Sequence, residues 1–101
     1  MVIDFTQKLT NIVTKKVFVN DDGTNLTLMN VACNALFANI EEEKIDGQEK
    51  LKRYELASKI IKNPKFDLMA EEIVKIKELT AKVYGTMVVG IVYKILEGKG
   101  E

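Results

Sequence analysis

The chain has 101 residues, of which 47% are hydrophobic and 30% charged, and its 15 basic residues balance its 15 acidic ones. This length predicts a single domain, 1–101, and the hydrophobic share excludes a disordered chain. The balanced charge argues against a nucleic-acid partner, because proteins that hold phosphates usually carry a basic surplus.

The first region, 2–26, predicts an antiparallel β-hairpin. Apolar and polar residues nearly alternate at its start, as in a half-buried strand, and the apolar set is Ile3, Phe5 and Leu9. The sequence Asn-Asp-Asp-Gly at 20–23 is a strong turn signal, because Asp and Gly tolerate positive φ. We therefore expect strands at 2–10 and 16–20 and a short third strand at 24–26.

A helical region, 27–97, follows the strands. Its first helix is expected to begin near Thr27 and to end around 38–39, with Thr27 or Asn25 as the N-cap. Apolar residues recur at helical spacing on one face, namely Leu28, Val31, Ala32, Ala35 and Leu36. The acidic segment at 41–44 is predicted to be a charged linker.

The second helix has clear start and stop signals. Asp46 stands three residues before Glu49, which is the spacing of a capping box, and Asn63-Pro64 ends the helical pattern. The expected core stripe consists of Leu51, Tyr54, Ala57 and Ile61, widened by Ile60.

The third helix is expected to begin at 68–70, with Glu71 and Glu72 in its first turn, where negative charge suits the helix dipole. Its apolar stripe is Ile73, Ile76, Leu79 and Val83. The last segment, 85–96, is rich in β-branched residues, which favour a strand, but its length and unbroken apolar run favour a buried helix. We expect a helix that continues the third or bends at Gly85.

Together these elements predict an α+β fold in which an N-terminal antiparallel β-hairpin packs on a bundle of three to four helices. Residues 98–101 are expected to be a frayed tail. The first residues lack the basic and apolar regions of a signal peptide, and the longest apolar stretch, 87–96, is too short to span a bilayer. We expect a cytoplasmic protein with no membrane partner.

Residues that carry common enzyme chemistry are scarce. The sequence has no histidine and one cysteine, Cys33, which excludes an internal disulfide, Ser-His and Cys-His pairs and the usual zinc sites. We therefore expect no enzyme activity, no cofactor and no bound metal. A carboxylate-based hydrolase stays an alternative, although no pair of acidic residues can be nominated for it.

The C-terminal apolar run is the leading candidate for a binding surface. A helix that is apolar all round must be buried on all sides, and three short helices and a hairpin would not enclose it fully. The remaining apolar area would then bind a protein partner or a second copy of the chain. The competing interpretation is that this segment is the central helix of a monomer. The candidate interface residues are Met87, Val88, Ile91, Val92, Tyr93 and Ile95.

The second helix offers an alternative binding surface. It is the most basic region of the chain, and a helix of this kind can contact phosphates. The nucleic-acid candidates are Lys50, Lys52, Arg53 and Lys59. The competing interpretation is a solvated helix face, relieved by Glu49 and Glu55.

The order of elements resembles that of small proteins encoded by phages or prophages, in which a β-hairpin precedes a helical bundle. The stretches that carry the resemblance are DGTNLTL at 22–28, QEKLKRYELA at 48–57 and AEEI at 70–73. The resemblance implies a phage accessory protein, such as an assembly factor or a modulator of a host protein in the host cytoplasm. It assigns no functional residue.

Overall fold

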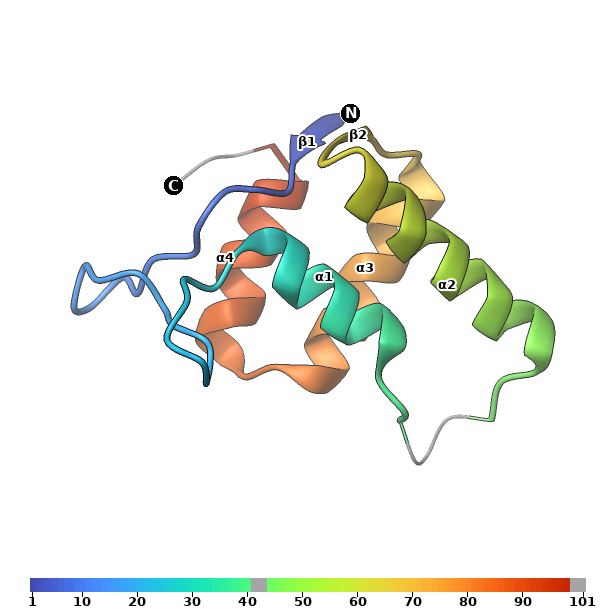
Figure 1. Cartoon of the computed structure of the whole chain (residues 1–101), viewed down its shortest axis with the longest axis horizontal. Coiled ribbons are helices and arrows are strands. Elements are labelled where there is room, and N and C mark those ends of the chain that lie inside the picture. The colour runs from blue at the N-terminus through green and yellow to red at the C-terminus, as the bar shows by residue number, and fades with distance from the viewer. Residues whose placement is uncertain (41–43, 99–101) are drawn as a thin grey trace.

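The computed structural model describes residues 1–40 and 44–98, and the described chain holds one two-stranded sheet and four helices (Figure 1). The predicted α+β class, with an antiparallel pair of strands packed on helices, is confirmed. Residues 41–43 of the predicted linker and 99–101 of the predicted tail lie outside the described residues. In chain order the elements are β1 (Val2–Asp4), α1 (Leu28–Phe37), α2 (Gly47–Lys62), β2 (Lys65–Asp67), α3 (Ala70–Val83) and α4 (Thr86–Leu96).

The partner of the first strand differs from the one expected. β1 pairs with β2, so that Ile3 lies opposite Phe66, and not with residues 16–20. Pro64 ends α2 and leaves the chain extended, and its carbonyl accepts a hydrogen bond of 2.8 Å from the Phe5 N–H. Ile3 is buried and Phe66 is half-buried, so the pleat points both side chains toward the core.

Residues 5–27 contain three extended segments, around Leu9, Phe18 and Leu26, and each segment is hydrogen-bonded through its backbone to the other two. The Leu9 N–H donates to Leu26 at 3.0 Å, Phe18 donates to Leu9 at 2.9 Å, and Leu26 donates to Phe18 at 2.8 Å. Because each segment bonds to both of the others, no two segments form a continuous ladder of backbone hydrogen bonds. The predicted strands at 16–20 and 24–26 are reduced to isolated bridges, Lys8–Thr27, Thr10–Val17 and Val19–Asn25.

Helix α1 lies at the centre of the fold and contacts both α2 and α3 (Figure 1). Its predicted core residues are all buried, which confirms the stripe that begins at Leu28. The predicted cap is also confirmed, because the Thr27 hydroxyl accepts from the Asn30 N–H at 3.2 Å while the Asn30 side chain accepts from the Thr27 N–H at 3.0 Å.

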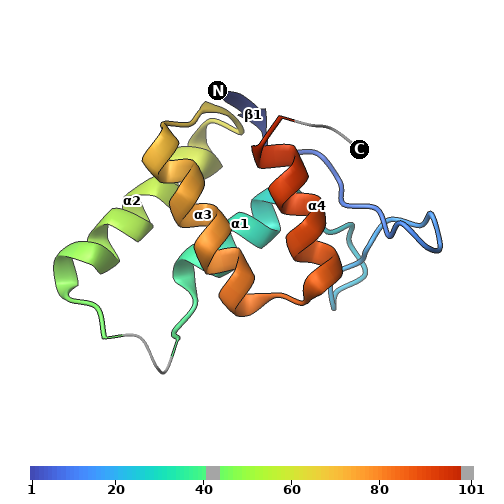
Figure 2. The ribbon, with the colours of Figure 1, turned by 180° about the vertical axis from the view of Figure 1, so that it is seen from behind.

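The C-terminal segment is a helix, as predicted, and it bends away from α3 at Tyr84 and Gly85, which are both extended. Seen from behind, α3 and α4 lie side by side in front of α1 (Figure 2). Packing of α4 against α3 outweighs the strand preference of the β-branched residues in α4.

Helix α2 starts at its predicted cap, where the Asp46 carboxylate accepts from the Glu49 N–H at 2.9 Å. Its predicted core stripe is confirmed at Ala57 and Ile60 and is wrong at its other three positions. The buried residues are Arg53, Leu56, Ala57 and Ile60, whereas Leu51, Tyr54 and Ile61 point to solvent. Arg53 can be buried on this side because its side chain pairs with Glu49.

Candidate functional site

The predicted interface residues of α4 are largely used within the chain. Val92 is fully buried, and Val88, Ile91 and Ile95 pack partly against the core. Met87 and Tyr93 are half-buried.

Tyr93 has two further contacts with α3. Its hydroxyl donates to the Lys77 carbonyl at 3.3 Å, and the Lys77 ammonium lies 4.8 Å from the centre of its ring. The described part of α4 therefore leaves no fully exposed large apolar side chain.

The basic candidates on α2 do not form one surface. Lys50, Lys52 and Lys59 are exposed, but only 8% of the Arg53 side chain is accessible. The Arg53 Nε donates to Glu49 Oε2 at 2.9 Å, so this guanidinium is directed into the fold and not toward an external phosphate.

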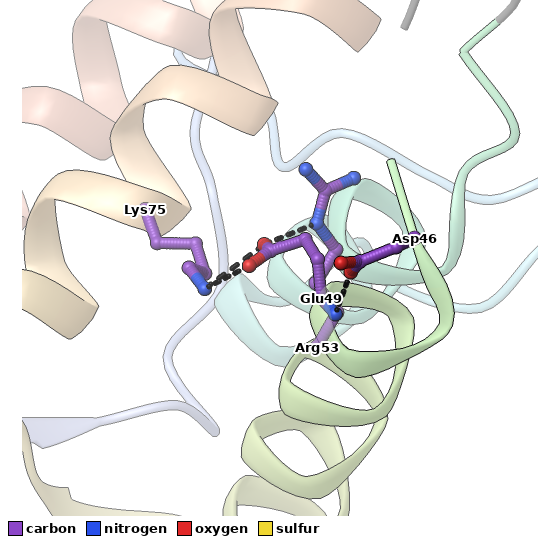
Figure 3. A network of polar contacts seen from close by, with 4 residues as sticks. All are labelled: Asp46, Glu49, Arg53 and Lys75. Carbon is purple, nitrogen blue, oxygen red and sulfur yellow. Dashed lines mark hydrogen bonds and ion pairs between the residues drawn. The ribbon is translucent and has the colours of Figure 1, made fainter. Parts of the chain in front are cut away.

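Glu49 contacts two cations, Arg53 on its own helix and Lys75 on α3, and the second contact joins α2 to α3, as Figure 3 shows. Besides the bond from Arg53, its Oε2 lies 2.9 Å from the Lys75 Nζ. The hydrogen bond from Lys75, helped by Arg53, holds the pKa of Glu49 below its ordinary value and outweighs the opposite effect of burial. The cluster is a set of ion pairs that links two helices, and the charged groups of Glu49, Arg53 and Lys75 already contact one another.

The other titratable groups singled out by the sequence have structural roles. The Asp22 carboxylate accepts from both the N–H and the hydroxyl of Thr24, and these bonds lower its pKa and close the turn. Burial raises the pKa of the Cys33 thiol, which makes it less reactive at neutral pH. Within residues 1–40 and 44–98, no group of three or more acidic or cysteine side chains could hold a metal ion.

An unexpected feature is an apolar stripe on the solvent side of α2. Leu51, Tyr54 and Ile61 are 46%, 60% and 52% exposed. Their spacing of three and then seven residues keeps them on one face of the helix. Phe37, which is 53% exposed at the end of α1, extends the stripe, because its ring centre lies 6.4 Å from that of Tyr54.

A hollow of about 470 Å³ opens beside these two rings, between the end of α1 and the first half of α2. Tyr54 and Lys50 belong to both the hollow and the exposed side of α2. Its described lining combines apolar side chains with three cations, and it comprises Leu36, Phe37, Ala38, Asn39, Ile40, Lys44, Ile45, Lys50, Arg53 and Tyr54.

Lys50 and Lys62 flank the stripe, whereas helical spacing places Lys52 and Lys59 toward the other side of α2 from Tyr54 and Ile61. None of the four exposed lysines of α2 forms an ion pair with another described residue, in contrast to Lys75 and Lys77, which do. We call the surface formed by the stripe and its neighbours the outer face of α2, and its residues are Leu51, Tyr54 and Ile61 together with Lys50 and Lys62.

Sequence reasoning missed this face because it assigned the stripe to the core. Two apolar stripes run along α2, and the competing one starts at Leu56. The signal that could have separated them is the spacing of Glu49 and Arg53, since an i, i+4 pair can be buried where a lone arginine cannot.

No family model matches the chain, and neither does any curated protein or solved structure. No helix within the described residues is long and apolar enough to cross a membrane.

Proposed function

We propose that the chain is a small protein–protein interaction module that binds its partner through the outer face of α2. The observation that carries the proposal is the row of exposed apolar side chains at Leu51, Tyr54 and Ile61. Single exposed apolar residues are normal, but a contiguous group that includes aromatic rings is typical of interfaces.

This surface supports the proposal better than α4 does. Val92 and Leu96 of α4 are already buried in the core, whereas α2 buries Leu56 and Ile60 on one side and still exposes three apolar residues on the other. The resemblance to small phage- or prophage-encoded proteins supports a more specific role, namely a phage assembly factor or a modulator of a host protein in the cytoplasm.

A photo-crosslinking amino acid at position 54 tests the proposal in cells of the source organism. We expect a covalent protein adduct that disappears when Ile61 is also replaced by serine. The matched control carries the crosslinker at Val19, which is equally exposed but lies outside the helices. Equal adducts from both positions, or none from position 54, would contradict an interface on α2.

Single-stranded nucleic acid is a second candidate partner. Its specific support is the exposed ring of Tyr54 beside Lys50, because bases stack on aromatic side chains and lysines attract the backbone. The inward direction of Arg53 removes one of the expected phosphate contacts. Titration with labelled DNA and RNA at about 50 mM salt, where phosphate contacts are strong, tests it. Lack of binding there would eliminate this candidate.

A further inference from the structure

We infer that the tight turn at 11–16 is a contact site for the surface of an anionic lipid bilayer. Ile12 and Val13, at the tip of the turn, enter the boundary between headgroups and acyl chains, and the lysines that follow them meet the lipid phosphates. This site is separate from the outer face of α2 and goes beyond the proposed function. It revises the expectation of no membrane partner, which rested on the lack of a spanning segment, because a surface contact needs none.

The tip is unusually apolar for a turn. Val13 is 74% exposed, more than any other large hydrophobic side chain described, and the adjacent Ile12 is 61% exposed. Neither belongs to the hydrophobic core. Turns normally consist of polar residues and glycine, so a pair of branched apolar side chains in this place indicates a contact outside the chain.

The turn also projects from the body of the molecule. Figure 1 and Figure 2 show the segment at 5–27 on the side of α4 that faces away from α2, with its first loop extending farthest from the helices. The Thr10–Val17 bridge closes the base of this loop. The tip can therefore reach a flat surface before the helices do.

Hydrogen bonds hold the turn in one conformation. The side-chain oxygen of Asn11 accepts from the N–H groups of Val13 at 2.8 Å and Thr14 at 3.1 Å, and its carbonyl accepts from the Lys15 N–H at 2.9 Å. Lys15 has a φ of 66°, which is strained for any residue with a side chain. A fixed turn presents its apolar pair without a further loss of backbone freedom on binding.

The charge near the tip favours an anionic surface. Lys15 and Lys16 follow the tip directly, Lys8 lies on the segment that leads into the turn, and the sequence holds no acidic residue within 5–20. All three lysines are exposed and form no ion pair with the described residues. The next acidic residues belong to a second turn, at 20–23. Each lysine near an anionic bilayer raises the affinity about fivefold.

A protein is a poorer occupant of this tip than a bilayer. The apolar part is two residues wide, whereas a stable protein interface buries about 800 Å² of each partner. A projecting tip would also need a matching pocket on that partner. A bilayer adapts to a projecting tip, and its boundary region, about 5–10 Å deep, accommodates a pair of apolar side chains.

Tryptophan fluorescence tests the inference directly, because the chain contains no tryptophan of its own. The variant Val13→Trp is mixed with vesicles of phosphatidylcholine and phosphatidylglycerol, and separately with vesicles of phosphatidylcholine alone. We expect a blue shift of the emission, and quenching by lipids with brominated acyl chains, with the anionic vesicles. The matched control is Tyr54→Trp, at an equally exposed position on α2, which should not shift. No shift at position 13, an equal shift at position 54, or an equal shift with neutral vesicles would overturn the inference.

Vesicle sedimentation then separates the two parts of the site without a fluorophore at the tip. We expect Lys15→Gln/Lys16→Gln to lower the affinity for anionic vesicles at least about tenfold, since two lysines are lost. Val13→Asn should also weaken binding, whereas Lys50→Gln/Lys62→Gln on α2 should leave it unchanged. Unchanged melting curves establish that each variant is folded. Equal binding by all of these proteins would overturn the inference.

A photo-crosslinking amino acid at position 13 provides the competing outcome. Capture of a protein at this position, with no binding to vesicles, would make the tip a protein contact and overturn the inference. The crosslinker at position 54 tests a different surface, so failure there counts against the proposed function and leaves the vesicle results unchanged.

Discussion

The Nζ of Lys75 on α3 lies 2.9 Å from Oε2 of Glu49 on α2, and the same carboxylate oxygen accepts from Arg53. One carboxylate therefore holds a buried guanidinium in place and ties two helices together. The two cations lower the pKa of Glu49, so the ionised form of this side chain stabilises the folded state.

Replacing Glu49 by glutamine should lower the free energy of unfolding at pH 7 by about 1–3 kcal/mol, because two charge-assisted hydrogen bonds weaken. The pKa of Glu49 is lower in the folded chain than its ordinary value of 4.5. The stabilisation is therefore complete above that value and is lost as the pH falls below it. Urea titrations of both proteins between about pH 7 and pH 3 measure the difference, with the exposed Glu55→Gln as control. A difference that persists undiminished at pH 3 would contradict this role.

The neighbouring residues Ile60 and Ile61 should respond in opposite ways to truncation. Ile60 is fully buried, and its change to alanine should cost about 2–5 kcal/mol. Ile61 is half exposed, and the same change there should cost less than about 0.5 kcal/mol. Chemical denaturation of the two variants compares them directly. Similar losses at both positions would mean that α2 is rotated toward the stripe expected from the sequence.

Thr80 should be replaceable by valine without loss. Its side chain is fully buried, and its hydroxyl has no hydrogen-bond partner among the described residues. Valine has nearly the same shape and removes the cost of an unsatisfied hydroxyl, so we expect unfolding to become about 1 kcal/mol less favourable. Thermal denaturation detects the change as a higher melting temperature. A lower one would indicate that the hydroxyl has a stabilising contact.

Two turn residues, one a lysine and the other a glycine, have positive φ. Lys15 has a φ of 66° and Gly23 has a φ of 88°. A side chain is strained in this region, so Lys15→Gly should stabilise the chain and Gly23→Ala should destabilise it, each by about 1 kcal/mol. Space around Gly23 is open, and any loss there reports backbone strain alone. Equilibrium unfolding of the two variants tests whether their free energies of unfolding change in opposite directions.

The mass of the chain in solution tests whether α4 mediates self-association. Since α4 uses most of its apolar surface in the core, we expect a monomer over a wide concentration range. Light scattering coupled to size-exclusion chromatography gives the mass. A dimer that dissociates on Ile91→Asp, in a protein that stays folded, would restore α4 as the interface.

Local signals in the sequence predicted local structure well. The caps at Thr27 and Asp46 and the stop before Pro64 are confirmed, because each depends on residues within one turn of a helix. The pairing of β1 with β2 was missed because its partners are far apart in the chain, and no short-range pattern connects Ile3 with Phe66.

The candidate site was harder to predict for a different reason. An apolar stripe at helical spacing identifies a face that avoids water, but it does not say whether the chain itself or a partner covers that face. Residues Leu51 and Ile61 satisfied the rule for a core as well as Leu56 and Ile60 did. Only the packing of α1 against α2 decides which of the two stripes is buried.

The pairing of β1 with β2 also has a consequence for synthesis on the ribosome. Ile3 is made 63 residues before its partner Phe66, which at roughly 5–20 residues per second is a delay of about 3 to 13 seconds. During that interval β1 can find neither its strand partner nor α3. The nascent chain therefore carries an unpaired strand edge until its second half is translated, and a chaperone or the ribosome surface has time to contact it.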